Sequence, residues 1–104
     1  MISYFVRYRG SAADPAAFIE YYATLKEFSG IRTLSLYEPI VWNDPFPVRP
    51  DGSALLVQMT FDTPADLERA LHSDARRRAR EDFGRFPLFS GEVTHQAMSG
   101  RIVF

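Results

Sequence analysis

The sequence contains no cysteine, and this one absence removes several classes of chemistry. Disulfides, thiolate catalysis and cysteine-based metal sites are excluded. The two histidines, His72 and His95, stand 23 positions apart with no His-x-His or Glu-x-x-His spacing, so we expect no metal site. The six glycines are isolated, which argues against a glycine-rich phosphate loop. Because no flavin, nicotinamide or haem motif is recognisable, we expect any catalysis to proceed without a cofactor.

Long hydrophobic runs and an excess of charge of one sign are also absent. No segment approaches transmembrane length, and the first residues form a strand-like pattern without a basic leader, so we expect a cytoplasmic protein with no membrane partner. The net charge of −1 gives no general attraction to nucleic acid. With 46% apolar and 24% charged residues, the chain is typical of a single globular domain, residues 1–104.

What the sequence does have is an ordered series of hydrophobic patterns. Alternating apolar residues predict strands, apolar residues at helical spacing predict helices, and Asp14-Pro15 and Thr63-Pro64 are typical helix starts. The second helical region is interrupted at Ser73-Asp74. The predicted elements, in order, are strand 2–9, a helix from Pro15 to Ser29-Gly30, strand 31–42, strand 54–61, helical segments between Pro64 and Gly84, and strand 92–98.

This order predicts an α+β fold, namely a ferredoxin-like βαββαβ protomer with a four-stranded antiparallel sheet and two helices on one face. The third strand, 54–61, is apolar on both faces with a few polar interruptions. Two helices cover only one face of such a sheet, so something else must cover the other. A second copy of the chain is the economical answer, and we therefore expect a homodimer.

The segment 43–53 is a proline-rich loop that is longer than a hairpin needs. Its prolines hold it extended and lower its entropy in the unfolded chain. Phe46 and Val48 alternate with the prolines and are costly to leave in water. We therefore expect the loop to fold over one barrel opening or onto the partner subunit and to bury Phe46.

Short motifs at the junctions between the expected elements point to a family. They are DPAAFIEYY at 14–22, SGIR at 29–32, MTFDT at 59–63, Leu67, Ala70-Leu71, Phe89 and Val93-Thr94. In this order they resemble the EthD-type proteins, which belong to the dimeric α+β barrel superfamily. The resemblance extends over nearly the whole chain.

The resemblance implies a protomer whose sheet packs on a second sheet, forming a barrel around a small-molecule cavity. Such proteins are often linked to the catabolism or biosynthesis of aromatic and polyketide-like compounds. Relatives include cofactor-free lactone isomerases, and the wider superfamily includes cofactor-free monooxygenases. Relatives usually carry a histidine followed by Pro-Leu at the end of the first helix. Here residues 25–28 run directly into Ser29-Gly30 without one, so its acid–base role cannot be carried over.

His95 and Arg7 are the candidate catalytic residues. From the fourth strand, an imidazole aimed into the cavity has a pKa suited to proton transfer. The alternative is a histidine on the solvent-facing or helix-facing side, satisfied by a backbone carbonyl. Arg7 alternates with Phe5 on a face that we expect to be buried in the dimer, so its guanidinium needs an acceptor. That acceptor is either an anionic or carbonyl-bearing ligand or a carboxylate in a structural salt bridge.

The candidate ligand-binding residues are aromatic, hydroxyl and amide side chains from several elements. Each also has a plainer interpretation as packing or as part of the dimer seam. His72, at a helix end, is expected to be a solvated capping residue. The ligand-binding candidates are Phe5, Tyr37, Trp42, Gln58, Thr60 and Phe86.

The arginine cluster at 76–80 invites a nucleic-acid interpretation, which we reject. At helical spacing these arginines spread around the exposed side, and Asp74, Glu81 and Asp82 are near enough to neutralise them. RNA-recognition domains share the strand order, but their aromatic signature is missing from the third strand. We expect a solvated helix face and no nucleic-acid partner.

Two functional hypotheses follow from these observations. In the first, the barrel binds a small, largely apolar, oxygenated molecule and acts on it as a cofactor-free isomerase, lyase or monooxygenase. Arg7 would then hold a carboxylate or enolate, His95 would move a proton, and Tyr37 and Gln58 would orient the ligand. In the second, the protein is a non-catalytic carrier, regulator or accessory subunit with a packed barrel. The sequence does not decide whether the protein is an enzyme, and the volume and lining of the cavity distinguish the two.

Overall fold

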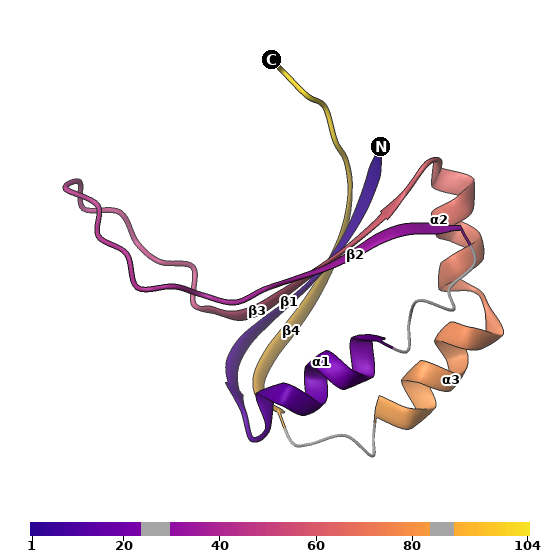
Figure 1. Cartoon of the computed structure of the whole chain (residues 1–104), viewed down its shortest axis with the longest axis horizontal. Coiled ribbons are helices and arrows are strands. Elements are labelled where there is room, and N and C mark those ends of the chain that lie inside the picture. The colour runs from indigo at the N-terminus through magenta and orange to yellow at the C-terminus, as the bar shows by residue number, and fades with distance from the viewer. Residues whose placement is uncertain (24–29, 84–88) are drawn as a thin grey trace.

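A computed structural model gives the fold and describes residues 1–23, 30–83 and 89–104. One antiparallel sheet of four strands carries all the described helices on one of its faces (Figure 1). The strands lie in the order β2-β3-β1-β4, so the predicted ferredoxin-like arrangement is confirmed. The elements are β1 Ile2–Ala12, α1 Pro15–Ala23, β2 Ile31–Tyr37, β3 Ser53–Phe61, α2 Pro64–Leu71, α3 Asp74–Phe83 and β4 Phe89–Ser99.

The core lies between the sheet and the helices. Along β1, Val6 and Tyr8 face the helices and are buried. On the neighbouring strand β3, Val57 stands opposite Val6, and the side chain of Val57 is fully buried. Since side chains alternate across a strand, one face of the sheet is apolar and holds the helices. The helices contribute the rest of the core, chiefly Phe18, Tyr21, Tyr22, Leu67, Ala70 and Ala79.

The helix starts follow the local signals in the sequence. Thr63 caps α2, and its hydroxyl oxygen accepts a hydrogen bond from the backbone N–H of Asp66 at 3.1 Å. The predicted interruption between the two helical segments is present, since α2 ends at Leu71 and α3 begins at Asp74. The end of the first predicted helix and the connector at 84–88 lie outside the described residues.

Several strand boundaries differ from the prediction. β2 ends at Tyr37 instead of Trp42, because Pro39 has no N–H to donate to a sheet and disfavours continuation of the strand. β4 begins at Phe89, so this residue belongs to a strand and not to an apolar connector. The first residues of β4 pair with the end of β1, which continues past Gly10 to Ala12.

The loop between β2 and β3 extends away from the body of the chain as an arm, residues 38–52 (Figure 1). Phe46 on this arm is 74% exposed. Phe46 is therefore not buried within the single chain, because the arm projects away from the fold. That the loop covers a barrel opening stays a prediction, since the barrel needs a second subunit. Burial of Phe46 on a partner subunit also stays a prediction.

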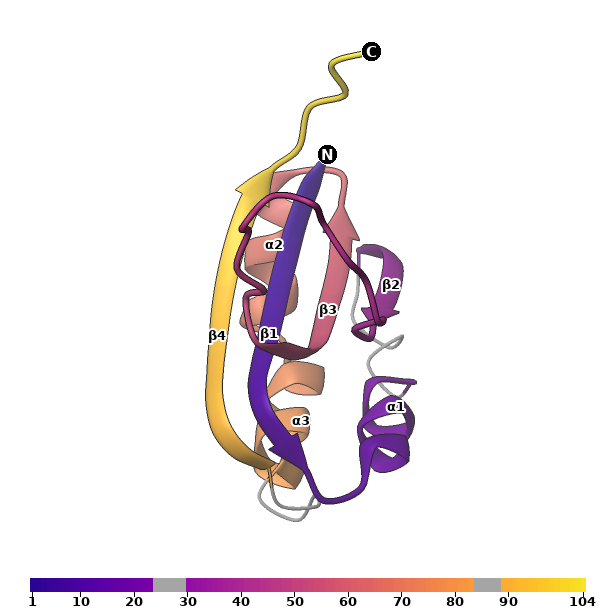
Figure 2. The same ribbon diagram turned by 90° about the vertical axis from the view of Figure 1, so that its left-hand side faces the viewer.

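The face of the sheet opposite the helices is uncovered in the single chain. Figure 2 looks onto this open face, with α2 and α3 behind the strands. Leu56 and Tyr37 stand opposite each other there, in the register that joins β2 to β3. Among the described residues, no helix has the length and apolar character needed to cross a membrane.

Candidate functional site

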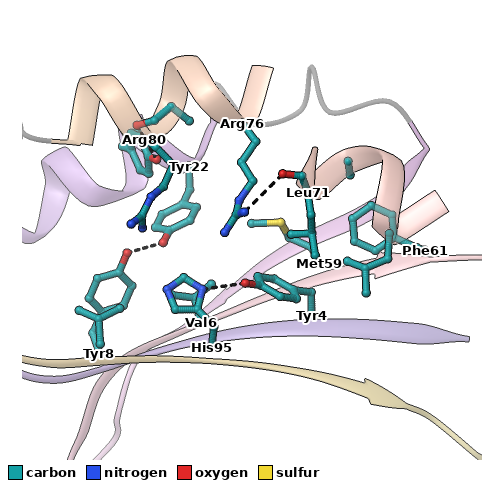
Figure 3. A pocket seen from close by; sticks show the side chains of 15 residues that line it. Tyr4, Val6, Tyr8, Tyr22, Met59, Phe61, Leu71, Arg76, Arg80 and His95 are labelled. Atoms are coloured by element: carbon teal, nitrogen blue, oxygen red, sulfur yellow. Dashed lines mark hydrogen bonds between the residues drawn. The ribbon is translucent and has the colours of Figure 1, made fainter. Parts of the chain in front are cut away.

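A cavity of about 390 Å³ lies between the sheet and the helices. Strands β1, β3 and β4 provide its floor, and α1, α2 and α3 provide its walls (Figure 3). Its volume falls within the range typical of small-molecule sites. The polar side chains that line it are Tyr4, Tyr8, Tyr21, Tyr22, Arg76, Arg80 and His95, and the apolar ones are Val6, Met59, Phe61, Leu67, Ala70, Leu71, Ala79 and Val93.

His95 faces this cavity from β4. It stands opposite Val6 of β1, so it points to the helix side of the sheet. A hydrogen bond of 2.9 Å joins its Nδ1 to the hydroxyl of Tyr4, which fixes the orientation of the ring. Burial lowers the pKa of His95, and the positive charges of Arg76 and Arg80 lower it further. The imidazole is therefore neutral near pH 7 and able to accept a proton.

A pair of tyrosines lies beside His95 on the same cavity wall. The hydroxyls of Tyr8 and Tyr22 hydrogen-bond to each other in a buried position. Burial raises the pKa of both hydroxyls, so both stay protonated. One of the two protons is used in their mutual bond, and neither hydroxyl has another hydrogen-bond partner among the described residues. The second proton is therefore available to a ligand oxygen.

The arginines of α3 divide between two environments. Arg77 is exposed and lies 3.3 Å from a carboxylate oxygen of Asp74 and 4.0 Å from one of Glu81, as expected for a solvated helix face. Arg76 and Arg80 instead line the cavity. Arg80 is exposed, as expected for a solvated helix face, and Arg76 is half-buried; both border the cavity because residues four positions apart share one helix face.

Arg7 lies on the opposite face of the sheet from His95. Its Nη1 is 2.5 Å from a carboxylate oxygen of Asp51 and donates to the hydroxyl of Ser53 at 2.6 Å. Of the two acceptors considered for this guanidinium, the structure supplies the carboxylate. Because Arg7 and His95 project from opposite sides of the sheet, one protomer does not bring them into a single site.

The other predicted ligand residues also lie outside the cavity. Tyr37 donates to the amide oxygen of Gln58 at 2.9 Å on the open face, and Gln58 donates to Ser3 at 3.1 Å. The hydroxyl of Thr60 bonds to that of Thr33 at 2.5 Å. Phe5 stands opposite Gln58 in the register and so shares that face.

At the base of the arm, the structure does bring Arg7, Tyr37 and Trp42 together around an open groove of about 450 Å³. Phe86 lies outside the described residues. The sequence had suggested one site containing all of these residues. The structure separates them because alternation along a strand sends neighbouring side chains to opposite faces.

The residues that sequence reasoning missed are Tyr4, Tyr8 and Tyr22, together with Arg76 and Arg80. The signal for the tyrosines was present, since Tyr4 and Tyr8 share a face of β1 with buried Val6. Among the described residues, no group of three or more histidine or acidic side chains is placed to hold a metal ion.

Comparison with solved structures identifies the fold. An EthD family protein from Bacillus halodurans superimposes with a TM-score of 0.67 at 18% identity, covering 97% of this chain and 100% of that one. A variant of SnoaB, a cofactor-independent oxygenase from Streptomyces nogalater, gives 0.65 at 12% identity over 98% and 94%. A dimeric ferredoxin-like protein of unknown function from Thermobifida fusca gives 0.59 at 9% identity over 94% and 89%.

The chain therefore has a ferredoxin-like fold that it shares with an EthD family protein and with a dimeric ferredoxin-like protein, and its predicted resemblance to EthD-type proteins is confirmed at the level of the fold. No family model matches the sequence, and comparison with curated proteins finds no match. Identities of this size establish the fold and leave the reaction to be argued from the site.

Proposed function

We propose that this protein is a homodimer that binds a small, largely apolar, oxygenated molecule and transforms it by proton transfer without a cofactor. The observation that carries this proposal is the cavity of about 390 Å³ into which His95 and the tyrosine hydroxyls converge. Its apolar floor suits an aromatic, lactone or polyketide-like compound. Its few polar groups suit the task of orienting that compound.

His95 is the proposed general base. Neutral imidazole carries one N–H, and in the tautomer that we propose, Nδ1–H donates to the oxygen of Tyr4. This leaves the lone pair of Nε2 free to take a proton from a carbon next to a carbonyl group. The resulting enolate oxygen would accept a hydrogen bond from the Tyr8–Tyr22 pair, whose second proton is available.

Proton transfer of this kind serves more than one reaction. Returning the proton to a different carbon isomerises the substrate. Alternatively, the carbanion reacts with molecular oxygen. One oxygen atom converts the methylene carbon into a carbonyl group, and the other leaves as water. The fold shared with a cofactor-independent oxygenase supports including this second outcome. A non-catalytic carrier would use the same cavity without turnover, and the helix-side cavity favours a ligand-binding protein over a module with no space for a ligand.

The homodimer is supported by the uncovered sheet face and by the dimeric protein that shares this fold. A second sheet packed on the open face would cover Leu56 and the polar network around Gln58. In this arrangement the cavity with His95 stays within each protomer, on the far side of the sheet from the dimer seam.

The test uses two enolisable probes, anthrone and α-acetyl-γ-butyrolactone. Under argon in D₂O, the wild type should speed the exchange of the acidic C–H of at least one probe, and His95→Gln should reduce that acceleration by about 10²–10⁴-fold. His72→Gln is the matched control, because His72 is exposed and its side-chain partners among the described residues are the helix backbone and Glu68. Oxygen uptake in air then distinguishes oxygenation from isomerisation. Binding without any acceleration by the wild type would mean a carrier, and the catalytic proposal would be abandoned.

A further inference from the structure

Arg76 and Arg80 are one turn apart on α3, and both border the cavity. Figure 3 shows both side chains extending from α3 toward the sheet, Arg80 toward the tyrosine pair and Arg76 toward the side of the cavity that holds Met59. Arg76 donates through Nη1 to the backbone carbonyl of Leu71 at 3.3 Å, which is a neutral acceptor. Within the described parts of the chain, neither guanidinium forms an ion pair with a carboxylate.

The cavity itself also supplies no negative charge. Of the described side chains that line it, none is acidic. The carboxylates on α3 that the structure does pair, those of Asp74 and Glu81, are bound to Arg77 on the outer side of the helix. Two cations thus border a largely apolar space with no carboxylate paired to them in the described structure. Arg76 is half-buried and Arg80 is exposed, so both keep contact with water, and their positive field favours an anionic ligand over a neutral one.

We propose that Arg76 and Arg80 form an anion-binding site, and that the ligand of this cavity is a flat, largely apolar molecule bearing an ionised oxygen group. This inference rests on the proposed function and narrows it to an anionic substrate class. A guanidinium offers a planar fork of N–H donors that matches a carboxylate or an ionised enol or phenol. The anion would lie near α3, and the apolar body of the ligand would extend over Val6 and Met59.

The arginines and the groups around His95 would then have different roles. The arginines would hold a charge that the ligand already carries, whereas His95 and the tyrosine pair act on the reacting part of the molecule. The positive field of the arginines also keeps His95 neutral, so the binding group and the base support each other. Arg7, which the sequence suggested for the anion, is already paired with Asp51 on the other face.

The test compares three ligands of similar shape by calorimetry: 2-naphthoate, 2,4-dinitro-1-naphtholate and the neutral 2-naphthamide. We expect at least one of the two anions to bind about tenfold or more tightly than the amide, and the tighter anion identifies the group as a carboxylate or an ionised phenol. Arg80→Gln and Arg76→Gln should each remove most of this preference and leave amide binding unchanged. Arg77→Gln is the matched control and should bind all three ligands as the wild type does.

The outcomes separate this inference from the proposed function. If the amide binds as tightly as both anions, the cavity is a small-molecule site but the anion inference is wrong. If none of the three binds, both proposals fail. Because Arg76 also bonds to the backbone of Leu71, its variant is checked for folding by circular dichroism. Arg80, which has no such bond in the described structure, keeps the test decisive if Arg76→Gln unfolds.

Discussion

At the scale of single residues, His95 lies where an apolar surface meets two positive charges. Burial and the charges of Arg76 and Arg80 act in the same direction, and both disfavour the protonated imidazole. The hydrogen bond to Tyr4 holds the ring in place. The surroundings of His95 thus keep its imidazole neutral at physiological pH, and among the described residues no carboxylate bonds to it.

The first prediction concerns the titration of His95. Its imidazole resonances, followed by NMR, should titrate with a pKa below the ordinary value of 6.5. Arg80→Gln should raise that pKa toward 6.5, because one of the two nearby cations is removed, while Arg77→Gln should leave it unchanged. An unaltered pKa in the Arg80 variant would contradict the electrostatic account.

The depressed pKa also sets the sign of a stability effect. Because the unfolded chain takes up the histidine proton at a higher pH than the folded one, the free energy of unfolding should fall as the pH drops below 6.5. His95→Gln should show a smaller fall over the same interval.

Residue roles were the part of the site least accessible from the sequence. The sequence analysis gave His95 a catalytic role if it faced the barrel cavity and a plainer one if it faced solvent or the helices. The structure places it on the helix side, where its partner is the hydroxyl of Tyr4 and not a backbone carbonyl. Arg7 is paired with Asp51, which lies 44 positions away in the sequence. Sequence spacing gives no measure of such contacts, whereas the alternation along β1 did group Tyr4, Val6 and Tyr8 correctly.

At the scale of elements, the paired strands β1 and β4 depend on two glycines. Gly10 and Gly91 stand opposite each other, and both have φ of +143°. A Cβ built on Gly10 would lie 2.0 Å from the carbonyl oxygen of Ser90, which is far inside contact distance. The two strands therefore approach each other here in a conformation that only glycine adopts at low cost.

The second prediction is that Gly10→Ala lowers the free energy of unfolding by about 3 kcal/mol, because a side chain there is strained and collides with the opposite backbone. Gly100→Ala is the control, since its added carbon would meet its nearest atom at an ordinary 3.5 Å. Chemical denaturation measures both. Equal stability of the two variants would show that the β1–β4 pairing does not depend on Gly10.

Elements were the part of the fold that the sequence predicted best. Alternation located all four strands, and Thr63 with Pro64 located the start of α2. The errors fell at strand ends. Glycine usually marks the end of a strand, yet the β1–β4 ladder extends through Gly10 and Gly91. The two glycines pair with each other, and the backbone opposite each one leaves no room for a Cβ.

At the scale of the whole molecule, the third prediction is a homodimer formed through the open sheet face. Sedimentation should give twice the chain mass of 11.9 kDa. Leu56→Glu should produce monomers, because it places a charge on the sheet face that the second subunit is proposed to cover. Ala65→Glu, on the exposed side of α2, should remain dimeric. A wild type that is monomeric at micromolar concentration would contradict this assembly.

The fourth prediction concerns the arm at residues 38–52. If Phe46 is an anchor on the partner subunit, Phe46→Ala should weaken the dimer by about 3 kcal/mol or more, because a large apolar contact is lost. The monomer fold should be unaffected, since Phe46 is 74% exposed in the single chain. Equilibrium sedimentation of the variant measures the effect, and an unchanged dimerisation constant would show that the arm is not an anchor.

The central claim is that the ligand binds under the helices and not on the open face of the sheet. Its most direct test is the set of intermolecular NOEs from bound 2-naphthoate. The account predicts contacts from the ligand protons to His95, Tyr4 and Met59, all of which line the cavity. Contacts to Tyr37 and Trp42 instead would place the ligand in the groove at the base of the arm and contradict the account.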